Sequence, residues 1–268
     1  MTDMSQPIRV LLVSGIGRLH FAEYATILKA NNVDCTLVTG WIPKAGYRPL
    51  VNFIGYLIGR NNLYDRLQLR QTVSGLHSSK IIQLVTPEII GTLALKFSRF
   101  DSFVFKGNLM KLAWVLSGFL TSKHIHKFDI VHIRSGSGQG HLIKKARKLN
   151  IPVVVDHTIA HPDYLYEALI GANAAPNSSR RTGSNRAFWN LALKDCNDSD
   201  VILVNSNFVK KTFLAKSFTD TKIYVNYLGV RYDFIGIKST YISEKPVIQL
   251  LFTGNFCTRK GAHYLISA

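Results

Sequence analysis

Residues 8–31 read IRVLLVSGIGRLHFAEYATILKAN, and this stretch contains the pattern that decides the fold. Residues 8–14 form a largely apolar run that ends at Gly15, which is typical of a strand buried on both faces of a parallel sheet. A glycine-containing turn follows, and residues 19–30 then predict a helix closed by the Asn pair at 31–32. A strand, a glycine turn and a helix in this order are the first part of a βαβ unit.

The same alternation continues along the chain. Further strands are expected at residues 33–39, 80–85, 130–133, 152–156, 201–205 and 223–225, and helices at 142–149 and 207–217. Residues 41–78 and 97–127 are expected to be amphipathic and helical, and the polar residues 172–186 to form a loop. Strands that alternate with helices predict an α/β fold with a mainly parallel sheet and helices on both faces.

A change in composition near residue 236 predicts a domain boundary. Residues 1–235 are expected to form one Rossmann-like domain, and residues 236–246, GIKSTYISEKP, are typical of a linker. Residues 247–253 then predict a new strand and residues 261–268 a helix. A single β-α unit cannot bury its own apolar face, so residues 247–268 are expected to be only the start of a second Rossmann-like domain.

The charge balance restricts the class of partner. The chain of 268 residues has 33 Lys and Arg against 16 Asp and Glu, a net charge of +17. This excess excludes an acidic solvating protein and favours nucleic acid, a phosphate-bearing substrate or an anionic membrane face. Nucleic acid is the less favoured of these, because no helix-turn-helix, zinc-finger, RNP or KH pattern occurs.

Other residue counts exclude several kinds of site and suggest a compartment. The four glutamates lie too far apart for chemistry that needs two close ones (Glu23, Glu88, Glu167 and Glu244). Three scattered cysteines argue against a disulfide framework or a structural zinc site and favour buried thiols in a reducing cytoplasm. No signal peptide is recognised, and no apolar run reaches the ~18 residues of a membrane-spanning helix.

Two glycine-rich turns are candidates for binding sites. The first, GIGRLH at 15–20, does not fit a dinucleotide fingerprint, because His20 stands at the third glycine and residues 33–39 end without a carboxylate for a ribose. It is either a tight turn or a loop whose backbone approaches a substrate. The second, RSGSGQGH at 134–141, is either a plain turn or a set of exposed N–H groups that holds an anion.

Titratable residues gather in DHTIAHPD at 156–163, where the fifth predicted strand ends. Ligands of open α/β sheets bind at the carboxyl ends of the strands. The two histidines and two aspartates can serve acid–base chemistry or bind a metal, although Pro162 argues against a helical pair of metal ligands. His157 is interpreted either as a polar group that faces a substrate or as a hydrogen-bonded structural histidine.

A second anion site is suggested near the C-terminal end. In LLFTGNFCTRKG at 250–261, a predicted strand ends at Gly254, and Arg259 and Lys260 stand where a helix begins. Cations beside exposed N–H groups can bind a diphosphate, although the pair can also be a solvated surface charge. The Asp-Ser-Asp sequence at 198–200 precedes a buried strand and is expected to be a turn rather than a metal site.

Taken in order, these segments resemble the retaining glycosyltransferases of family 4, which have the GT-B fold. The resemblance covers nearly the whole chain, and its most specific part is the G-x-x-x-x-R-K-G pattern at 254–261. The segments that carry it are residues 8–31, DIVHIR at 129–134, VVVDHT at 153–158, DVILVNS at 200–206, KIYVNYLGV at 222–230 and residues 250–261.

The resemblance implies a GT-B architecture, in which two Rossmann-like domains face a cleft. The N-terminal domain then holds the acceptor and the C-terminal domain the nucleotide sugar. His157 is expected to contact the donor sugar at the reacting centre, and Lys260 to neutralise the departing diphosphate; these two are the catalytic candidates. The donor phosphates are assigned to Gly15, Gly17, Arg259 and Lys260, and the acceptor side to His20, Arg134, Ser135 and His161.

The implied function is that of an enzyme, a glycosyltransferase of the hexosyltransferase type. It moves a sugar with retention from a nucleotide sugar to a saccharide or lipid-linked acceptor, in the synthesis of a cell-surface polysaccharide or glycolipid. No metal, no other cofactor and no nucleic-acid partner are expected. The alternatives are a truncated, non-catalytic subunit and, less favoured, a basic nucleic-acid-binding protein.

Two departures from the family pattern concern the donor side. Asn255 stands where the family usually has arginine, which leaves Arg259 as the candidate for the missing charge. The E-x7-E pair that grips the nucleotide sugar is expected well downstream of Lys260, and residues 261–268 do not contain it. The chain as written is therefore expected to lack most of the donor site.

Two predicted helices suggest a membrane contact. Residues 48–60 and 103–121 mix apolar residues with arginine and lysine. Such helices can dock at an anionic leaflet, which predicts a cytoplasmic protein that associates peripherally with the inner membrane face. The alternative is an ordinary core-facing helix with a solvated basic edge.

Overall fold

The computed structural model describes residues 7–16, 20–57, 59, 61–68, 80–96, 103–171, 189–229, 250–254, 256 and 260–267. For residues 95–96, 103–107 and 169–171, the structure describes the backbone only. The predicted loop at 172–186, the predicted linker at 236–246 and the site candidates Gly17 and Arg259 lie outside these residues.

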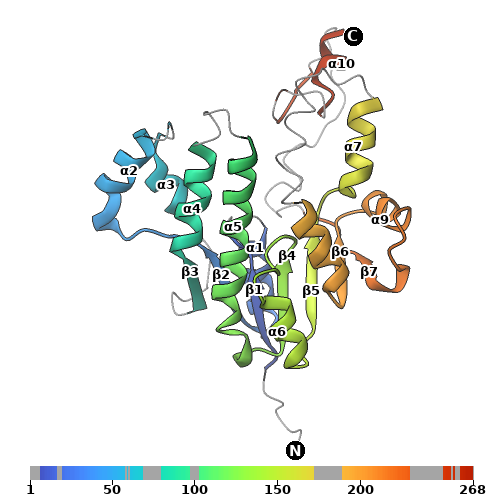
Figure 1. Cartoon of the computed structure of the whole chain (residues 1–268), viewed down its shortest axis with the longest axis horizontal. Coiled ribbons are helices and arrows are strands. Elements are labelled where there is room, and N and C mark those ends of the chain that lie inside the picture. The colour runs from blue at the N-terminus through green and yellow to red at the C-terminus, as the bar shows by residue number, and fades with distance from the viewer. Residues whose placement is uncertain are drawn as a thin grey trace, which may run out of the picture.

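Seven parallel strands form one sheet in the order β3-β2-β1-β4-β5-β6-β7 (Figure 1). Their bounds are β1 Arg9–Val13, β2 Asp34–Gly40, β3 Ile81–Leu84, β4 Ile130–Arg134, β5 Val153–His157, β6 Val201–Val204 and β7 Ile223–Val225. Each lies within about one residue of its prediction, which confirms the α/β class with a parallel sheet. The strand order reverses between β1 and β4, so the carboxyl ends of these two strands form the switch point where ligands of such sheets bind.

The strands are connected mainly through helices. The helices are α1 Phe21–Ala30, η1 Ala45–Tyr47, α2 Arg48–Leu57, α3 Leu63–Gln68, α4 Val85–Lys96, α5 Phe103–Ser122, η4 Ile125–Lys127, α6 Leu142–Lys148, α7 Pro162–Gly171, α9 Asn207–Leu214, η5 Asp220–Lys222 and α10 Ala262–Ser267, and residues 189–198 are also helical. The helix expected at 207–217 begins as predicted but ends earlier, at Leu214, and the end predicted for α1 is confirmed. Asn32, after α1, has the left-handed φ of 59°, and the Ser206 hydroxyl accepts the backbone N–H of Val209 at the start of α9.

Helix α4 was not predicted, because Pro87 suggested the end of a strand. Proline has no N–H to donate, but the first turn of a helix leaves its N–H groups without intrahelical partners. Pro87 stands in that first turn, so the chain passes from β3 directly into α4. Helices α4 and α5 then pack against each other.

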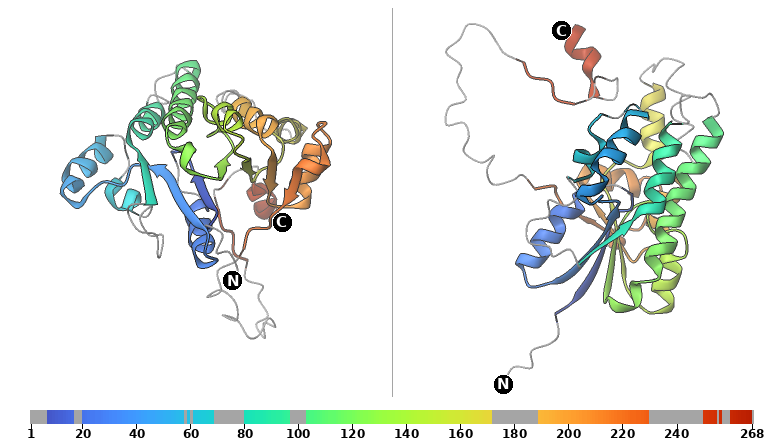
Figure 2. Two further views of the ribbon diagram at one scale, coloured as in Figure 1. Left: turned by 90° about the horizontal axis from the view of Figure 1, so that it is seen from below. Right: turned by 90° about the vertical axis from the view of Figure 1, so that its left-hand side faces the viewer.

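Different helices cover the two faces of the sheet (Figure 2). Val10 and Leu12 of β1 pack against Phe21 and Ala25 of α1 on one face. Leu11, in contrast, belongs to the larger cluster on the face that α5 and α6 cover. Because successive side chains of a strand point to opposite faces, β1 must be apolar at nearly every position.

Two smaller predictions are confirmed. Cys35 and Cys196 are buried free thiols, whereas Cys257 lies outside the described residues. The Asp-Ser-Asp sequence is a helix-to-strand turn, in which the Asp200 carboxylate accepts the backbone N–H of Val153 at 2.7 Å and the Asp198 carboxylate pairs with Lys194 at 2.8 Å.

The predicted strand at 247–253 is wrong for the residues that are described. Residues 250–253 are not in a strand, and the side chains of Leu250 and Leu251 are exposed. A strand satisfies its backbone through a neighbour, and the described residues place no strand beside this one. The following helix is confirmed as α10, whereas the division into two domains remains a prediction.

Candidate functional site

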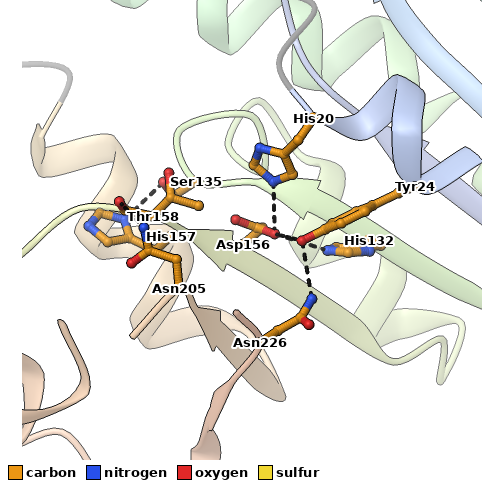
Figure 3. A network of polar contacts seen from close by, with 9 residues as sticks. All are labelled: His20, Tyr24, His132, Ser135, Asp156, His157, Thr158, Asn205 and Asn226. Carbon is orange, nitrogen blue, oxygen red and sulfur yellow. Dashed lines mark hydrogen bonds and ion pairs between the residues drawn. The ribbon is translucent and has the colours of Figure 1, made fainter. Parts of the chain in front are cut away.

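Polar side chains gather at the carboxyl edge of the sheet, near the switch point between β1 and β4 (Figure 3). Asp156 in β5 pairs in register with Arg134 in β4. His20, at the start of α1, lies at the same place. Three segments that are distant in sequence therefore meet where an α/β sheet binds its ligands.

The Asp156 carboxylate is the centre of this cluster and is buried. Its Oδ2 lies 3.1 Å from His20 Nε2, 3.2 Å from the Tyr24 hydroxyl and 3.9 Å from His132 Nε2. The Tyr24 hydroxyl in turn accepts a hydrogen bond from Asn226 Nδ2 at 3.1 Å. His20 and Tyr24 reach the same oxygen because residues four apart share one face of a helix.

The surrounding groups have pKa values that suit a buried carboxylate. Burial and the neighbouring Asp156 raise the pKa of Tyr24, so its hydroxyl remains a donor. Burial lowers the pKa of Arg134 to about 10, which leaves it a cation at neutral pH, with its guanidinium 5.0 Å from the ring centre of Trp114. Burial lowers the pKa of His132 to about 4, so this histidine is neutral.

A pH prediction follows from His132. Because the fold lowers its pKa from 6.5 to about 4, the neutral ring contributes stability above pH 6.5 that is lost as the pH falls toward 4. We expect His132→Phe to reduce the acid-induced loss of unfolding free energy by about 3 kcal/mol. Urea titrations of wild type and variant at pH 7 and pH 4 measure this difference.

The comparison with wild type isolates His132 from other groups. Burial raises the pKa of Asp195 to about 7, so protonation of Asp195 favours the folded state as the pH falls. This contribution is the same in both proteins and cancels in the comparison. His132→Phe keeps the contact with the Phe21 ring, 5.1 Å away between centres. An unchanged pH dependence in the variant would mean that the ring of His132 takes up its proton in the folded state near its ordinary pKa.

His157 lies on the other face of the sheet from Asp156. Its Nδ1 is 2.9 Å from Ser135 Oγ, and its ring packs edge-on against Phe213 at 5.0 Å between centres. The ring is 1% exposed, burial lowers its pKa to about 4, and its Nε2 has no partner among the described residues. The structure thus brings His157 and Ser135 together, and its contact with a donor sugar remains a prediction.

His161 is buried in an aromatic environment. Its ring lies 5.2 Å from Phe213 and 5.9 Å from Phe218, and its backbone N–H donates to Thr212 Oγ1 at 3.0 Å. Its Nδ1 accepts the backbone N–H of Asp163 at 3.2 Å. These contacts are those of a structural histidine, and its place on the acceptor side stays a prediction. In the described part of the chain, no three His, Cys, Asp or Glu side chains gather as a metal site would require.

The turn at 134–141 binds a carboxyl group of the chain itself. The carboxylate of Asp195, on helix 189–198, accepts the backbone N–H groups of Gly136 at 2.7 Å and Gly138 at 2.8 Å and the Gln139 amide at 2.5 Å. Asp195 is fully buried. The interpretation of this turn as a site for an external anion is therefore corrected, because an internal carboxyl group already accepts the N–H groups of Gly136 and Gly138.

Close backbone contacts explain the glycines around this turn. A Cβ on Gly118 of α5 would lie 1.7 Å from the Gln139 carbonyl oxygen, and one on Gly140 would lie 1.8 Å from the Val115 carbonyl oxygen. Gly15 has a φ of +68°, and its Cβ would lie 2.3 Å from the Trp114 ring. Packing accounts for Gly15 without a ligand, so its expected role toward the donor phosphates remains untested.

Lys260 is exposed at the start of the turn before α10. Its Cε lies 3.8 Å from where a Cβ of Gly254 would be. Residues 230–249, which connect this segment to the sheet, are outside the described residues. The described contacts do not join Lys260 to His157, and the shared catalytic site stays a prediction.

Sequence reasoning missed several members of the site. Tyr24 could have been found, because it follows His20 by one helical turn. His132 alternates with apolar residues in β4, which was a weaker signal. Asn226 and Asp195 had no local signal, since each meets its partners across more than fifty residues of chain.

Comparisons with solved structures concern the fold only. A UDP-glucosyltransferase from Polygonum tinctorium is 14% identical, with a TM-score of 0.49 over 85% of this chain and 54% of that one. A UDP-N-acetylglucosamine 2-epimerase is 11% identical, with a TM-score of 0.44 over 82% and 48%. The corresponding epimerase from Methanocaldococcus jannaschii is 12% identical, with a TM-score of 0.40 over 81% and 45%.

The chain spans about half the length of these solved structures. No match among curated proteins reached significance. The sequence profile of Glycosyltransferase Family 4 matches residues 18–234, a range that includes all seven strands except β1. This range holds His20, Asp156 and His157, and it covers most of the chain: the protein belongs to Glycosyltransferase Family 4.

Proposed function

We propose that this protein is a glycosyltransferase and that the described part of the chain forms the acceptor side of its site. The observation that carries the proposal is the cluster around Asp156 at the switch point of a Family 4 chain. There, His20 and Arg134 stand beside a buried carboxylate and can orient a sugar hydroxyl. The donor is a nucleotide sugar, and the acceptor is a saccharide or a lipid-linked saccharide.

The donor side of the proposal rests on other residues. Lys260 and Arg259 neutralise the diphosphate as it leaves, and the unpartnered Nε2 of His157 meets the donor sugar. Transfer proceeds with retention, in the synthesis of a cell-surface polysaccharide or glycolipid. A non-catalytic subunit is the alternative, and the same experiment separates the two.

The test is a transfer assay with the full natural gene product. UDP-glucose, UDP-galactose, UDP-N-acetylglucosamine and GDP-mannose are offered with p-nitrophenyl hexosides and with a prenyl-diphosphate-linked monosaccharide. We expect one pair to yield nucleoside diphosphate and a product heavier by one sugar, with the anomeric configuration of the donor by NMR. Absence of product from every pair would favour the non-catalytic subunit, and an inverted product would remove retention from the proposal.

Helix α2 supports a second proposal, that the protein docks on an anionic membrane surface. Its inner side buries Val51 and Gly55, but a second stripe of apolar side chains, Leu50, Phe53 and Leu57, is more than half exposed. Water-exposed apolar stripes of this kind mark interaction surfaces. Tyr47 and Tyr56 flank the stripe, and the net charge of +17 favours anionic lipid. None of the helices in the described ranges is long and apolar enough to cross a bilayer.

A flotation experiment tests the docking of α2. We expect the double variant Phe53→Ser with Tyr56→Ser to lose most binding to vesicles that contain anionic lipid, because two inserted side chains are removed. Tyr224→Ser is the matched control, since this exposed tyrosine lies on β7, at the opposite end of the sheet from β3 (Figure 1). Equal loss in the control, or binding that neither high salt nor neutral lipid weakens, would contradict the proposal.

A further inference from the structure

We propose that Ser135 is the positioning residue for His157, and that its hydroxyl holds the ring so that Nε2–H is presented to an oxygen of the donor sugar. This inference rests on the proposed function, which assigns the donor sugar to His157, and it names the residue through which the fold controls that contact. It is carried by the contact between Ser135 Oγ and His157 Nδ1 at 2.9 Å (Figure 3).

Hydrogen bonds fix the backbone on both sides of Ser135. Its own N–H donates to the Asp156 carbonyl oxygen at 3.0 Å, which extends the pairing of β4 with β5. The next residue, Gly136, donates its N–H to the Asp195 carboxyl group at 2.7 Å, and Gly138 donates to the same group at 2.8 Å. Ser135 is also buried. A short side chain on a backbone held in this way delivers its hydroxyl to one place.

Aromatic packing fixes the plane of the His157 ring but does not distinguish its two nitrogens. The ring lies 5.0 Å from Phe213 and 6.4 Å from Trp189, between ring centres. A half-turn about the Cβ–Cγ bond would keep these apolar contacts and exchange the positions of nitrogen and carbon atoms. Only a polar partner separates the two orientations, and among the described residues Ser135 is the side chain that bonds to the ring.

The hydroxyl of Ser135 also selects the tautomer of His157. Burial lowers the pKa of His157 to about 4, so at pH 7 the ring is neutral and carries a hydrogen on one nitrogen only. Ser135 Oγ has one hydrogen to donate, and within the described ranges its acceptor is Nδ1 of His157. Nδ1 therefore has the lone pair, and Nε2 carries the hydrogen.

The Nε2–H group of His157 lacks an acceptor that a ligand can supply. It is buried and has no partner in the part of the chain that the structure describes. Such groups are costly and rare in folded proteins, and some serve catalysis. His157 stands at the carboxyl end of β5, the edge where ligands of parallel sheets bind. As a donor to a sugar oxygen, the ring forms no bond to the anomeric carbon and takes up no proton, so the assignment agrees with retention.

Two-bond 1H–15N spectra of the full natural gene product test the hydrogen bond without substrate. The His157 signals are assigned by their absence in His157→Asn. We expect the Nε2–H tautomer in wild type, and in Ser135→Ala we expect the Nδ1 resonance to move toward that of a nitrogen without a hydrogen bond. An Nδ1–H tautomer in wild type, or an unchanged Nδ1 resonance in Ser135→Ala, would overturn the inference.

Ser137→Ala is the matched control for the spectra and for the kinetics. Ser137 is a buried serine of the same turn, and its hydroxyl has no partner among the described residues. Its removal should leave the His157 signals and the rate of transfer as in wild type. Thermal unfolding of both serine variants measures any change in stability that accompanies the substitutions.

The kinetic test uses the donor and acceptor of the transfer panel that give product. We expect kcat of Ser135→Ala to fall about 10-fold, roughly the effect of one hydrogen bond. The acceptor KM should be nearly unchanged, because His157 is assigned to the donor and not to the acceptor. A loss confined to kcat distinguishes a positioning role from a general disturbance of the site.

The outcomes separate this inference from the proposed function. If wild type forms product and Ser135→Ala keeps more than about a half of its kcat, or loses no more than Ser137→Ala, Ser135 does not position the ring and the proposed function stands. If wild type transfers nothing from any donor, the proposed function fails and the inference fails with it, whatever the spectra show.

Discussion

Replacement of Asp195 by alanine is expected to destabilise the fold by about 3 to 5 kcal/mol, a large part of the stability of an ordinary domain. The carboxylate accepts three hydrogen bonds in a fully buried position, two of them from the backbone of Gly136 and Gly138. Without it, these buried donors lose their acceptor, and each unsatisfied group costs about 1 to 3 kcal/mol. Urea unfolding followed by circular dichroism measures the loss.

Asp198→Ala is the matched control for this experiment. Asp198 stands at the end of the same helix, at 189–198, and its ion pair with Lys194 is partly exposed. Surface pairs of this kind contribute about 1 kcal/mol or less, so the control should stay close to wild type. A loss below about 1 kcal/mol in Asp195→Ala itself would show that water satisfies the turn equally well.

Loss of the two predicted donor contacts is expected to lower transfer by orders of magnitude. Removing a fixed charge or a hydrogen-bond donor at the reacting centre commonly costs about 10²- to 10³-fold in kcat. We expect this for Lys260→Ala and for His157→Asn, with folding unchanged. The measurement is single-substrate kinetics with the active donor and acceptor pair, together with thermal unfolding of each variant.

The choice of asparagine at position 157 follows from the structure. Alanine would open a cavity beside Phe213, and that defect alone can destabilise the protein. Asparagine can keep a polar atom near Nδ1 for Ser135 while it removes Nε2, the atom assigned to the donor. Lys194→Ala controls for the loss of an exposed lysine. Near-normal turnover in either site variant would remove that residue from the catalytic centre and leave His157 a structural histidine.

Much of the fold could be read from the sequence because its signals are local. Each buried strand is a short apolar run between turn residues, and a strand inside a parallel sheet must be apolar on both faces. The position of Asp156 and His157 at a strand end was equally visible, because carboxyl ends of strands follow from the strand pattern itself. The strand expected at 247–253 is wrong at its described residues. An apolar run forms a strand only where a neighbouring strand pairs with it, and the run itself does not show whether such a neighbour exists.

The partners of each polar group were decided by the tertiary structure alone. The turn at 134–141 has the composition of an anion site, and only the packing of helix 189–198 reveals that Asp195 fills it. The sequence does not distinguish Gly118 from any other helical glycine. Only the packing of α5 against the Gln139 carbonyl shows that no Cβ fits at this position. Adjacent in sequence, Asp156 and His157 point to opposite faces of the sheet and join different clusters.

The sequence by itself therefore determined the α/β class, the seven strands of the sheet and the edge at which the site lies. The tertiary structure decided which side chains share that site, including the pairing of His20 with Asp156 across 136 residues. The physical reason is the distance along the chain over which each kind of interaction acts. Apolar periodicity acts between residues a few positions apart, whereas a buried carboxylate takes whatever donors the packed chain brings within about 3 Å, and those donors carry no mark in the sequence around it.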